Sequence, residues 1–246
     1  MNKFLWAGSS VAIALLAGCG GGGGGGTSTP VPTPIAKAEG VYQGPATNGT
    51  ATGTIGAVIL EDDSIWGIST VAGVPGIAGL FVGSGASNNG SYSATAKAYT
   101  PTVSGIDGSL SATYSPGISM AGTFSTGTSF NGTTTFPSGY IYNTPALLSS
   151  LVGRWNGTSM VGNLLSISIT STGNYSGTSG TCAFGGTMTP RPSGKNIFNV
   201  TYANGATGCP IPNVAAQGIA TVSSTGLLMM FTTADKAIGA AAILTK

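Results

Sequence analysis

Short runs in which polar and apolar residues alternate are the feature that most constrains the fold of this chain. The clearest runs occupy residues 91–99, 164–170 and 196–202. In an extended strand, every second side chain points to the same face, so a run of this kind has one apolar face and one polar face. The pattern predicts antiparallel β-strands, each of which buries one side against a core.

Turn-forming sequences separate these runs. They are Asn88-Asn89-Gly90, Ser115-Pro116-Gly117, Ser171-Thr172-Gly173-Asn174, Pro192-Ser193-Gly194 and Ser224-Thr225-Gly226. Glycine, asparagine and proline favour tight turns because they tolerate or preset the backbone angles that turns require. Turns at intervals of roughly 8–12 residues are typical of an antiparallel sandwich or barrel. The sequence therefore predicts an all-β protein.

The sequence also indicates an internal duplication. Gly40-Val41-Tyr42-Gln43-Gly44 recurs as Gly153-Arg154-Trp155-Asn156-Gly157. Further matches in the same order are Pro34 with Pro145, Trp66 with Tyr175, Gly108 with Gly218, Gly117 with Gly226, and Gly132 with Gly239. A run of matches at a nearly constant offset of about 110 residues points to two tandem copies. We expect one β unit at residues 39–136 and a second at residues 151–246.

The segment between the two units, residues 137–150, has the signature of a short helix. Thr144 is a suitable N-cap, and Pro145 would occupy the first helical position. The next three residues, Ala146-Leu147-Leu148, are helix formers. We expect a short connecting helix that begins there.

Charge content favours tandem antiparallel β-barrels over β-sandwiches. Open sheets commonly protect their edge strands with charged residues, lysine above all, whereas a closed barrel has no edge. Only 6% of this chain is charged, and Lys97 is the one charged residue in the runs 91–99 and 164–170. Each unit offers about seven or eight strands, enough for a small barrel.

The openings Gly40-Val41-Tyr42 and Gly153-Arg154-Trp155 resemble those of lipocalins, although each unit is short for that family and lacks its other markers.

The amino terminus has the layout of a secretory signal. Lys3 supplies a positive charge, and residues 4–16 form an apolar run that is too short to span a membrane. Leu16-Ala17-Gly18-Cys19 then resembles the lipobox of bacterial lipoproteins. The resemblance implies a signal peptide at residues 1–18, cleavage before Cys19, and acyl chains on that cysteine. Gly20 follows where an aspartate would favour the inner membrane, so we expect a lipid anchor in the outer membrane. The alternative is an ordinary signal peptide with an incidental cysteine.

Residues 19–38 read as a lipidated tether. Seven consecutive glycines begin at Gly20, and alternating prolines follow from Pro30 to Pro34. Polyglycine is flexible and alternating proline is semi-rigid, and fully extended the tether would reach roughly 65 Å. A glycine run after the lipidated cysteine resembles surface-displayed lipoproteins of some Gram-negative bacteria.

Two cysteines remain once Cys19 carries lipid. Cys182 and Cys209 both lie in the second unit, with the strand-like run 196–202 between them. An even number of cysteines in an oxidising compartment predicts a disulfide, and an antiparallel meander could place these two side by side. The alternative is two separate buried thiols.

Few residues in this chain could perform catalysis. Histidine is absent, which removes Ser-His-Asp and Cys-His chemistry and most zinc and copper sites. Asp107 with Asp235 stays open as a carboxylate pair, but nothing in the sequence points to it. Glu61-Asp62-Asp63 reads as a solvated hairpin turn in preference to a calcium site. We predict no catalytic residue, no metal and no cofactor.

These observations favour a non-enzymatic protein of the cell envelope with a structural or interaction role. Its expected partners are the membrane, through the lipid anchor, and an unidentified envelope or host protein. A net charge of +2 without a Lys/Arg cluster argues against nucleic acid. The alternative is a carrier that holds a small ligand inside a barrel. A cavity distinguishes the two, because a barrel packed solid with side chains has no room for a ligand.

Overall fold

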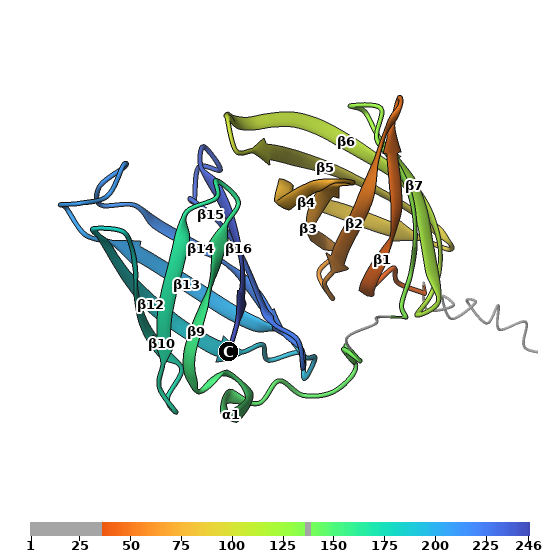
Figure 1. Ribbon diagram of the computed structural model, residues 1–246. Coiled ribbons are helices and arrows are strands. Elements are labelled where there is room, and N and C mark those ends of the chain that lie inside the picture. The colour runs from red at the N-terminus through yellow and green to blue at the C-terminus, as the bar shows by residue number, and fades with distance from the viewer. Residues whose placement is uncertain (1–35, 136–138) are drawn as a thin grey trace, which may run out of the picture. The chain divides into compact units, whose positions relative to one another are not determined.

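The computed structural model describes residues 36–135 and 139–246, and within these it contains sixteen strands and one helical turn. The strands form two closed antiparallel barrels in tandem (Figure 1). The prediction of an all-β chain with two tandem barrels is therefore confirmed. The predicted signal peptide, Cys19 and most of the tether lie outside the described residues.

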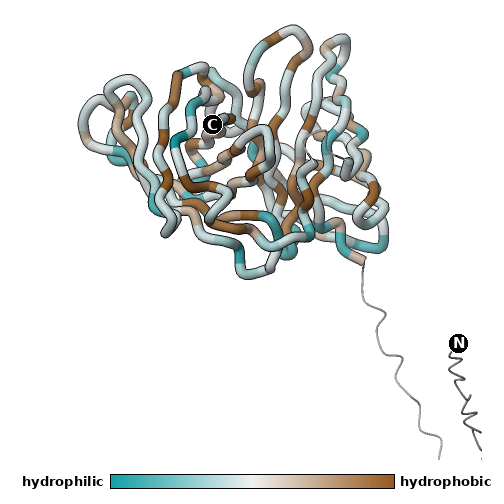
Figure 2. The backbone as a smooth tube through the Cα atoms, turned by 60° about the horizontal axis from the view of Figure 1, so that its bottom comes forward, coloured by the Kyte–Doolittle hydropathy of each residue, from teal (hydrophilic) through white to brown (hydrophobic). Residues whose placement is uncertain are grey.

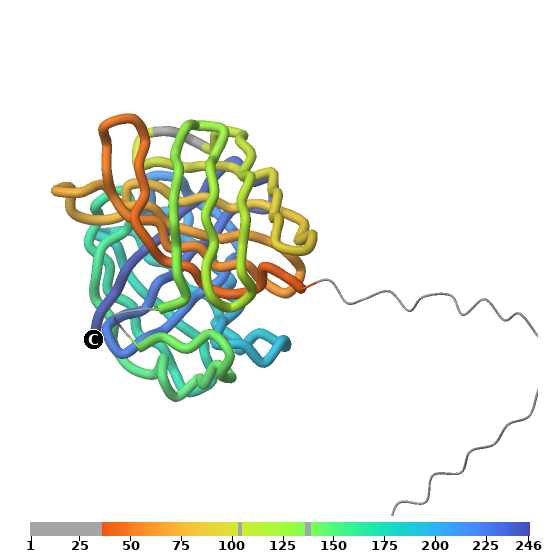
Figure 3. Tube along the Cα trace, turned by 90° about the vertical axis from the view of Figure 1, so that its right-hand side faces the viewer, coloured from red at the N-terminus to blue at the C-terminus, as the bar shows by residue number. Residues whose placement is uncertain are grey.

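The first barrel is an up-and-down meander in which each strand pairs with the next one in the chain. Its strands are β1 (Gly40–Asn48), β2 (Ala51–Ile59), β3 (Ser64–Val71), β4 (Val74–Asn88), β5 (Ser91–Thr100), β6 (Val103–Ser115), β7 (Ser119–Phe124) and β8 (Ser129–Thr133). β8 pairs back onto β1 and closes the barrel. Figure 3 shows the strands of this barrel running side by side from red to green.

The second barrel repeats this topology. Its strands are β9 (Gly153–Ser159), β10 (Leu164–Ile169), β11 (Asn174–Ser179), β12 (Cys182–Pro190), β13 (Phe198–Asn204), β14 (Ala215–Val222), β15 (Leu227–Thr232) and β16 (Gly239–Thr245). β16 pairs with β9 and closes it. Closure explains why the chain needs so few charges, since neither sheet has a free edge. In Figure 2, apolar stretches recur along the strands and strongly polar stretches are short.

The two barrels share one register as well as one topology. Following the paired residues strand by strand around each barrel assigns these equivalent interior positions: Tyr42 and Trp155, Ile65 and Tyr175, Phe81 and Phe184, Phe124 and Phe231, and Phe130 and Ala242. The duplication predicted from the sequence is therefore visible in the fold. Four of the five pairs keep a large side chain, and the last replaces a phenyl ring with a methyl group.

Four of the sequence matches behind that prediction are wrong in register. Tyr175 occupies the position of Ile65, and Trp66 lies on the opposite face of its strand. Gly218 likewise occupies the position of Leu110, two residues away from Gly108. A slip of one residue exchanges the two faces of a strand, and abundant glycine offers many false matches.

The third wrong match is Gly117 with Gly226, because Gly226 occupies the position of Ser119. The fourth wrong match is Gly132 with Gly239. Gly132 lies inside the first barrel, where a Cβ atom would stand 3.2 Å from the Cβ of Tyr42. A Cβ atom at Gly239 would instead meet the ring of Tyr99, which packs outside the barrels. These two glycines therefore face opposite sides of their sheets.

The connecting helix is shorter and begins later than the sequence predicts. Helix α1 (Leu148–Leu151) is a single turn, and Leu147 precedes it without a side-chain cap. Thr144 is not the N-cap, because its hydroxyl donates a 3.0 Å hydrogen bond to the carbonyl of Ile141. No helix among the described residues has the length and apolar character needed to cross a membrane.

Outward-facing apolar residues of the two barrels form a buried cluster of their own. Its members are Val41, Val58, Leu60, Ile77, Leu80, Val82, Tyr99, Tyr142, Met160, Ile197, Ile219, Met230 and Ala241. Tyr99 also donates a 2.9 Å hydrogen bond from its hydroxyl to the carbonyl of Lys236. The described residues accordingly belong to one compact unit.

Candidate ligand site in the second barrel

The interior of the second barrel holds an apolar cavity of about 640 Å³ that is open at one end. Strands on all sides of the barrel contribute to it, and its deeper walls are apolar. The inward-facing side chains that line it include Leu165, Ile167, Phe184, Tyr202, Met229 and Phe231. The volume lies within the range of about 300–1,000 Å³ that is typical of sites for small organic molecules.

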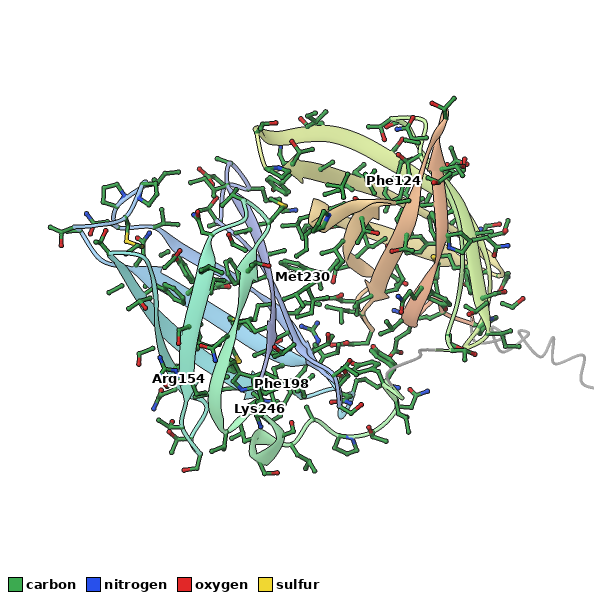
Figure 4. The ribbon with its side chains drawn as sticks, in the orientation of Figure 1. Phe124, Arg154, Phe198, Met230 and Lys246 are labelled. Carbon is green, nitrogen blue, oxygen red and sulfur yellow. A yellow bond between two sulfur atoms is a disulfide. The ribbon has the colours of Figure 1, made fainter. Side chains whose placement is uncertain are left out.

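Large side chains close the other end of this barrel. Trp155, Tyr175, Met188 and Phe198 are all buried in its core. Figure 4 shows Phe198 inside the barrel, at the end where Lys246 lies. The ammonium group of Lys246 stands 4.6 Å from the ring centre of Trp155 and covers the indole from outside. A ligand therefore has one way in, from the opposite end.

Hydrogen bonds fix the aromatic rings at the closed end. Trp155 Nε1 donates to the carbonyl of Leu151 at 2.6 Å, and the Tyr175 hydroxyl donates to the carbonyl of Thr201 at 2.7 Å. Burial raises the pKa of Tyr175 above its ordinary value, so its hydroxyl remains a neutral donor. Buried polar groups that keep their partners hold a core in one arrangement. The base of the cavity is therefore well defined.

The mouth of the cavity is apolar and is held together by the disulfide. Leu164, Val161 and Ile211 line the mouth with 77%, 53% and 51% of their surfaces exposed. The predicted bond between Cys182 and Cys209 is present, with their Cα atoms 4.3 Å apart. It ties the loop between β13 and β14 to the start of β12. Large exposed apolar side chains at a cavity mouth are typical of a binding surface.

Asn204 adds a second brace to the same loop. Its amide group donates to the carbonyl of Ile211 at 2.8 Å, and its side-chain oxygen accepts from the backbone N–H of Val214 at 2.7 Å. Both ends of the loop are thereby fixed beside the cavity. The mouth is preformed, as expected for a small-ligand site.

The first barrel fills the corresponding space with aromatic rings. The ring centres of Phe81 and Phe124 lie 4.9 Å apart, and those of Phe124 and Phe130 lie 5.9 Å apart. In the second barrel Ala242 occupies the position of Phe130. Ala242 and Ala240 stand on the same strand face and line the cavity, and Met229, paired with Ala242, lines it at the position of Gly122 in the first barrel.

The lining of the cavity is largely apolar and uncharged. None of the described residues that line it is an acid, a lysine or an arginine. Its hydroxyl groups, such as those of Ser159 and Ser179, have no histidine to activate them, because the chain contains none. An apolar molecule would be held there by van der Waals contact and by burial of its apolar surface from water.

The acidic segment Glu61-Asp62-Asp63 does form the hairpin turn between β2 and β3, but it is not simply solvated. Arg191, from the second barrel, contacts Glu61 at 2.8 Å and Asp62 at 3.2 Å. Partial burial opposes ionisation of Asp62, yet the hydrogen bonds from Ser64 and the charge of Arg191 together hold the pKa of Asp62 below its ordinary value. The turn therefore carries ion pairs between the barrels.

The other carboxylates have separate local partners. Asp107 pairs with Lys97 at 2.7 Å, and Asp235 accepts hydrogen bonds from the Thr233 hydroxyl and the backbone N–H of Ala237. Within residues 36–135 and 139–246, no three acidic or cysteine side chains gather as a metal site would require.

No protein-family model, no curated protein and no solved structure matches the chain.

Proposed function

We propose that this chain is a lipid-anchored protein of the outer membrane whose second barrel binds a small apolar molecule. The observation that carries the proposal is the open cavity in that barrel, at the place where the first barrel is filled by Phe130. Of the two roles expected from the sequence, carrier and pure interaction protein, a cavity supports the carrier. The apolar lining supports binding without chemical conversion.

The anchor and the location rest on the amino-terminal sequence. Leu16-Ala17-Gly18-Cys19 supports acylation of Cys19, and Gly20 supports sorting to the outer membrane. Two or more acyl chains give stable anchoring, at about 0.8 kcal/mol for each buried methylene group. The protein would then hold its ligand close to a membrane, where apolar molecules concentrate.

Binding can be tested on a soluble form of the chain that begins at Gly20 and keeps every described residue. N-phenyl-1-naphthylamine is a neutral apolar dye whose fluorescence rises in an apolar site. We expect saturable binding with one site per chain. Ala242→Phe restores the ring that the first barrel has, so it should weaken binding by at least about tenfold.

The matched control is Ile243→Phe, which adds a ring on the outer face of the same strand and should leave binding unchanged. A wild-type protein that gives no saturable signal, or an Ala242→Phe variant that binds as well as wild type, would contradict the proposed site. Circular dichroism establishes that each variant is folded.

Anchoring has a separate test. Cys19→Ala removes the acyl acceptor, so the full chain should leave the outer-membrane fraction. If the variant stays entirely in that fraction, the lipid anchor is wrong and the binding proposal is untouched.

A further inference from the structure

We infer that the cavity of the second barrel selects uncharged molecules with a flat ring system, which pack against an aromatic wall of Phe184, Tyr202 and Phe231. This inference rests on the proposed function and specifies its ligand class. It draws on the geometry of the wall, on the duplicated barrel and on the absence of charge.

The aromatic wall consists of three rings in sequence. The ring centres of Phe184 and Tyr202 lie 5.5 Å apart with planes 30° from parallel, and those of Tyr202 and Phe231 lie 5.0 Å apart at 16°. All three rings line the cavity. The stack of Tyr202 on Phe231 covers one face of each ring, and the outer face of Phe231 can take a further flat ring in the offset arrangement that aromatic groups prefer.

The first barrel shows what fits beside such a wall. Phe130 packs against Phe124 with ring centres 5.9 Å apart. Phe124 is equivalent to Phe231, and Phe130 is equivalent to Ala242. In the second barrel the position of Phe130 is reduced to a methyl group, while Met229, paired with Ala242, replaces Gly122 of the first barrel. Ala242, Met229 and Phe231 all line the cavity, so Phe130 serves as an internal stand-in for a ring bound beside Phe231.

Small residues keep this space open. Ala240 lies opposite Phe231 across the β15–β16 pair, and Ala242 is the next inward residue on β16. Ala216 adds a third methyl-sized side chain to the lining, from β14. Open volume thus lies directly beside the aromatic wall, and a ring that enters it would contact Phe231.

The ligand must be uncharged because the cavity offers nothing to balance a charge. No carboxylate, ammonium or guanidinium group is present among its described lining residues. Tyr202 is the one titratable side chain there, apart from the bonded Cys182, and burial raises its pKa above the ordinary value, so it remains neutral. An ion that moved into this site would lose hydration without a partner.

Tyr202 also provides a polar contact near the entrance. β13 runs from Phe198 at the closed end to Asn204 beside the mouth, so Tyr202 lies in the outer part of the cavity. The Asn204 side chain is already a hydrogen-bond partner of its hydroxyl, which can donate one further hydrogen bond to a ligand. A ligand would therefore enter with its apolar ring system first and keep a hydroxyl or carbonyl group toward the mouth.

Two matched pairs of probes test the ligand class on the soluble chain that begins at Gly20. N-phenyl-1-naphthylamine and 1-anilinonaphthalene-8-sulfonate share a ring skeleton and differ by a negative charge. Biphenyl and bicyclohexyl share a carbon skeleton, but only biphenyl has flat rings. The second pair is measured by displacement of the neutral dye.

We expect the neutral dye to bind at least about tenfold more tightly than the sulfonate. Biphenyl should displace it at a concentration about threefold to tenfold below that needed for bicyclohexyl, the factor expected of one aromatic contact. Phe231→Leu keeps the site apolar and should remove the preference for biphenyl. Ile243→Phe, on the outer face, should retain it.

The outcomes separate this inference from the proposed function. Equal displacement by biphenyl and bicyclohexyl, in the wild-type protein, would overturn the ring preference while the apolar site stands. Equal binding of the dye and its sulfonate would overturn the requirement for an uncharged ligand. Absence of binding by every probe would overturn both the ligand class and the carrier function.

Discussion

Trp155 donates a 2.6 Å hydrogen bond from its indole nitrogen to the carbonyl of Leu151, four residues before it in the chain. Tyr42 makes the equivalent bond in the first barrel, from its hydroxyl to the carbonyl of Ala38 at 2.9 Å. Both acceptor residues are fully buried. Each barrel thus closes one end with an aromatic side chain that ties the first strand to the segment that precedes it.

Removal of the indole donor should destabilise the protein. Trp155→Phe leaves the buried carbonyl of Leu151 without its partner, and we expect the free energy of unfolding to fall by about 1–3 kcal/mol from this cause. Urea denaturation followed by circular dichroism measures the change. Arg154→Lys, next to it on the outer face, is the matched control. An unchanged denaturation midpoint for Trp155→Phe would show that the bond contributes nothing.

The first barrel should lose stability in alkaline solution. Burial raises the pKa of Tyr42 to about 12, whereas an unfolded tyrosine titrates near pH 10. The folded state therefore holds this proton more tightly. The resulting stabilisation is complete below about pH 10 and is lost as the pH rises through about 12. Ultraviolet titration of tyrosinate, with Tyr42→Phe for comparison, checks this. A Tyr42 signal at the pH of a free tyrosine would contradict it.

The alternating pattern predicted the strands, and the low charge content favoured closed barrels over sandwiches. The run 164–170 became β10, and Ile167 and Ile169 are buried inside the second barrel as the pattern requires. The run 91–99 became β5, and Tyr99 keeps the alternation by facing outward, paired with Leu80. It is nevertheless buried, because it belongs to the cluster between the barrels. A pattern of period two does not reveal which outward-facing residues another barrel covers.

Contacts between distant segments could not be predicted from local patterns. The acidic turn at Glu61 looks solvated in sequence because its partner, Arg191, lies in the other barrel. A cavity inside a barrel was the alternative that the sequence left open, but its place in the second barrel could not be predicted, for a related reason. Alanines in β16 look like ordinary strand residues until the register pairs Ala242 with the position of Phe130. Comparing the two copies by face instead of by glycine matches would have provided that signal.

The disulfide should stabilise the second barrel without being required by the fold, since the first barrel has none among its described residues. The two cysteines are 27 residues apart. Loop-closure entropy in the unfolded chain predicts that Cys182→Ala with Cys209→Ala lowers the free energy of unfolding by about 3–4 kcal/mol. Denaturation of the double variant measures this. Rapid thiol labelling of the native, unreduced wild-type protein would show that the bond does not form.

The strongest test of the relation between the barrels is to open a cavity in the first one. Phe130→Ala reproduces the residue found at the equivalent position of the second barrel, Ala242. Loss of a buried phenyl ring should cost about 3–5 kcal/mol, because apolar contact is lost and a cavity remains. Thermal or urea denaturation measures that cost. A loss below about 1 kcal/mol would mean that the barrel collapses around the missing ring.

A small ring should then recover part of the lost stability. Dry apolar cavities made in this way can bind benzene, and any ligand that binds only the folded state raises the midpoint of unfolding. The double variant Phe130→Ala with Ala242→Phe isolates the effect, because its second barrel is filled. We expect benzene to raise the midpoint of the double variant and to leave Ala242→Phe alone unchanged. If benzene stabilises neither variant, Phe130 only packs the core of the first barrel. Its ring then does not indicate which ligand the second barrel binds.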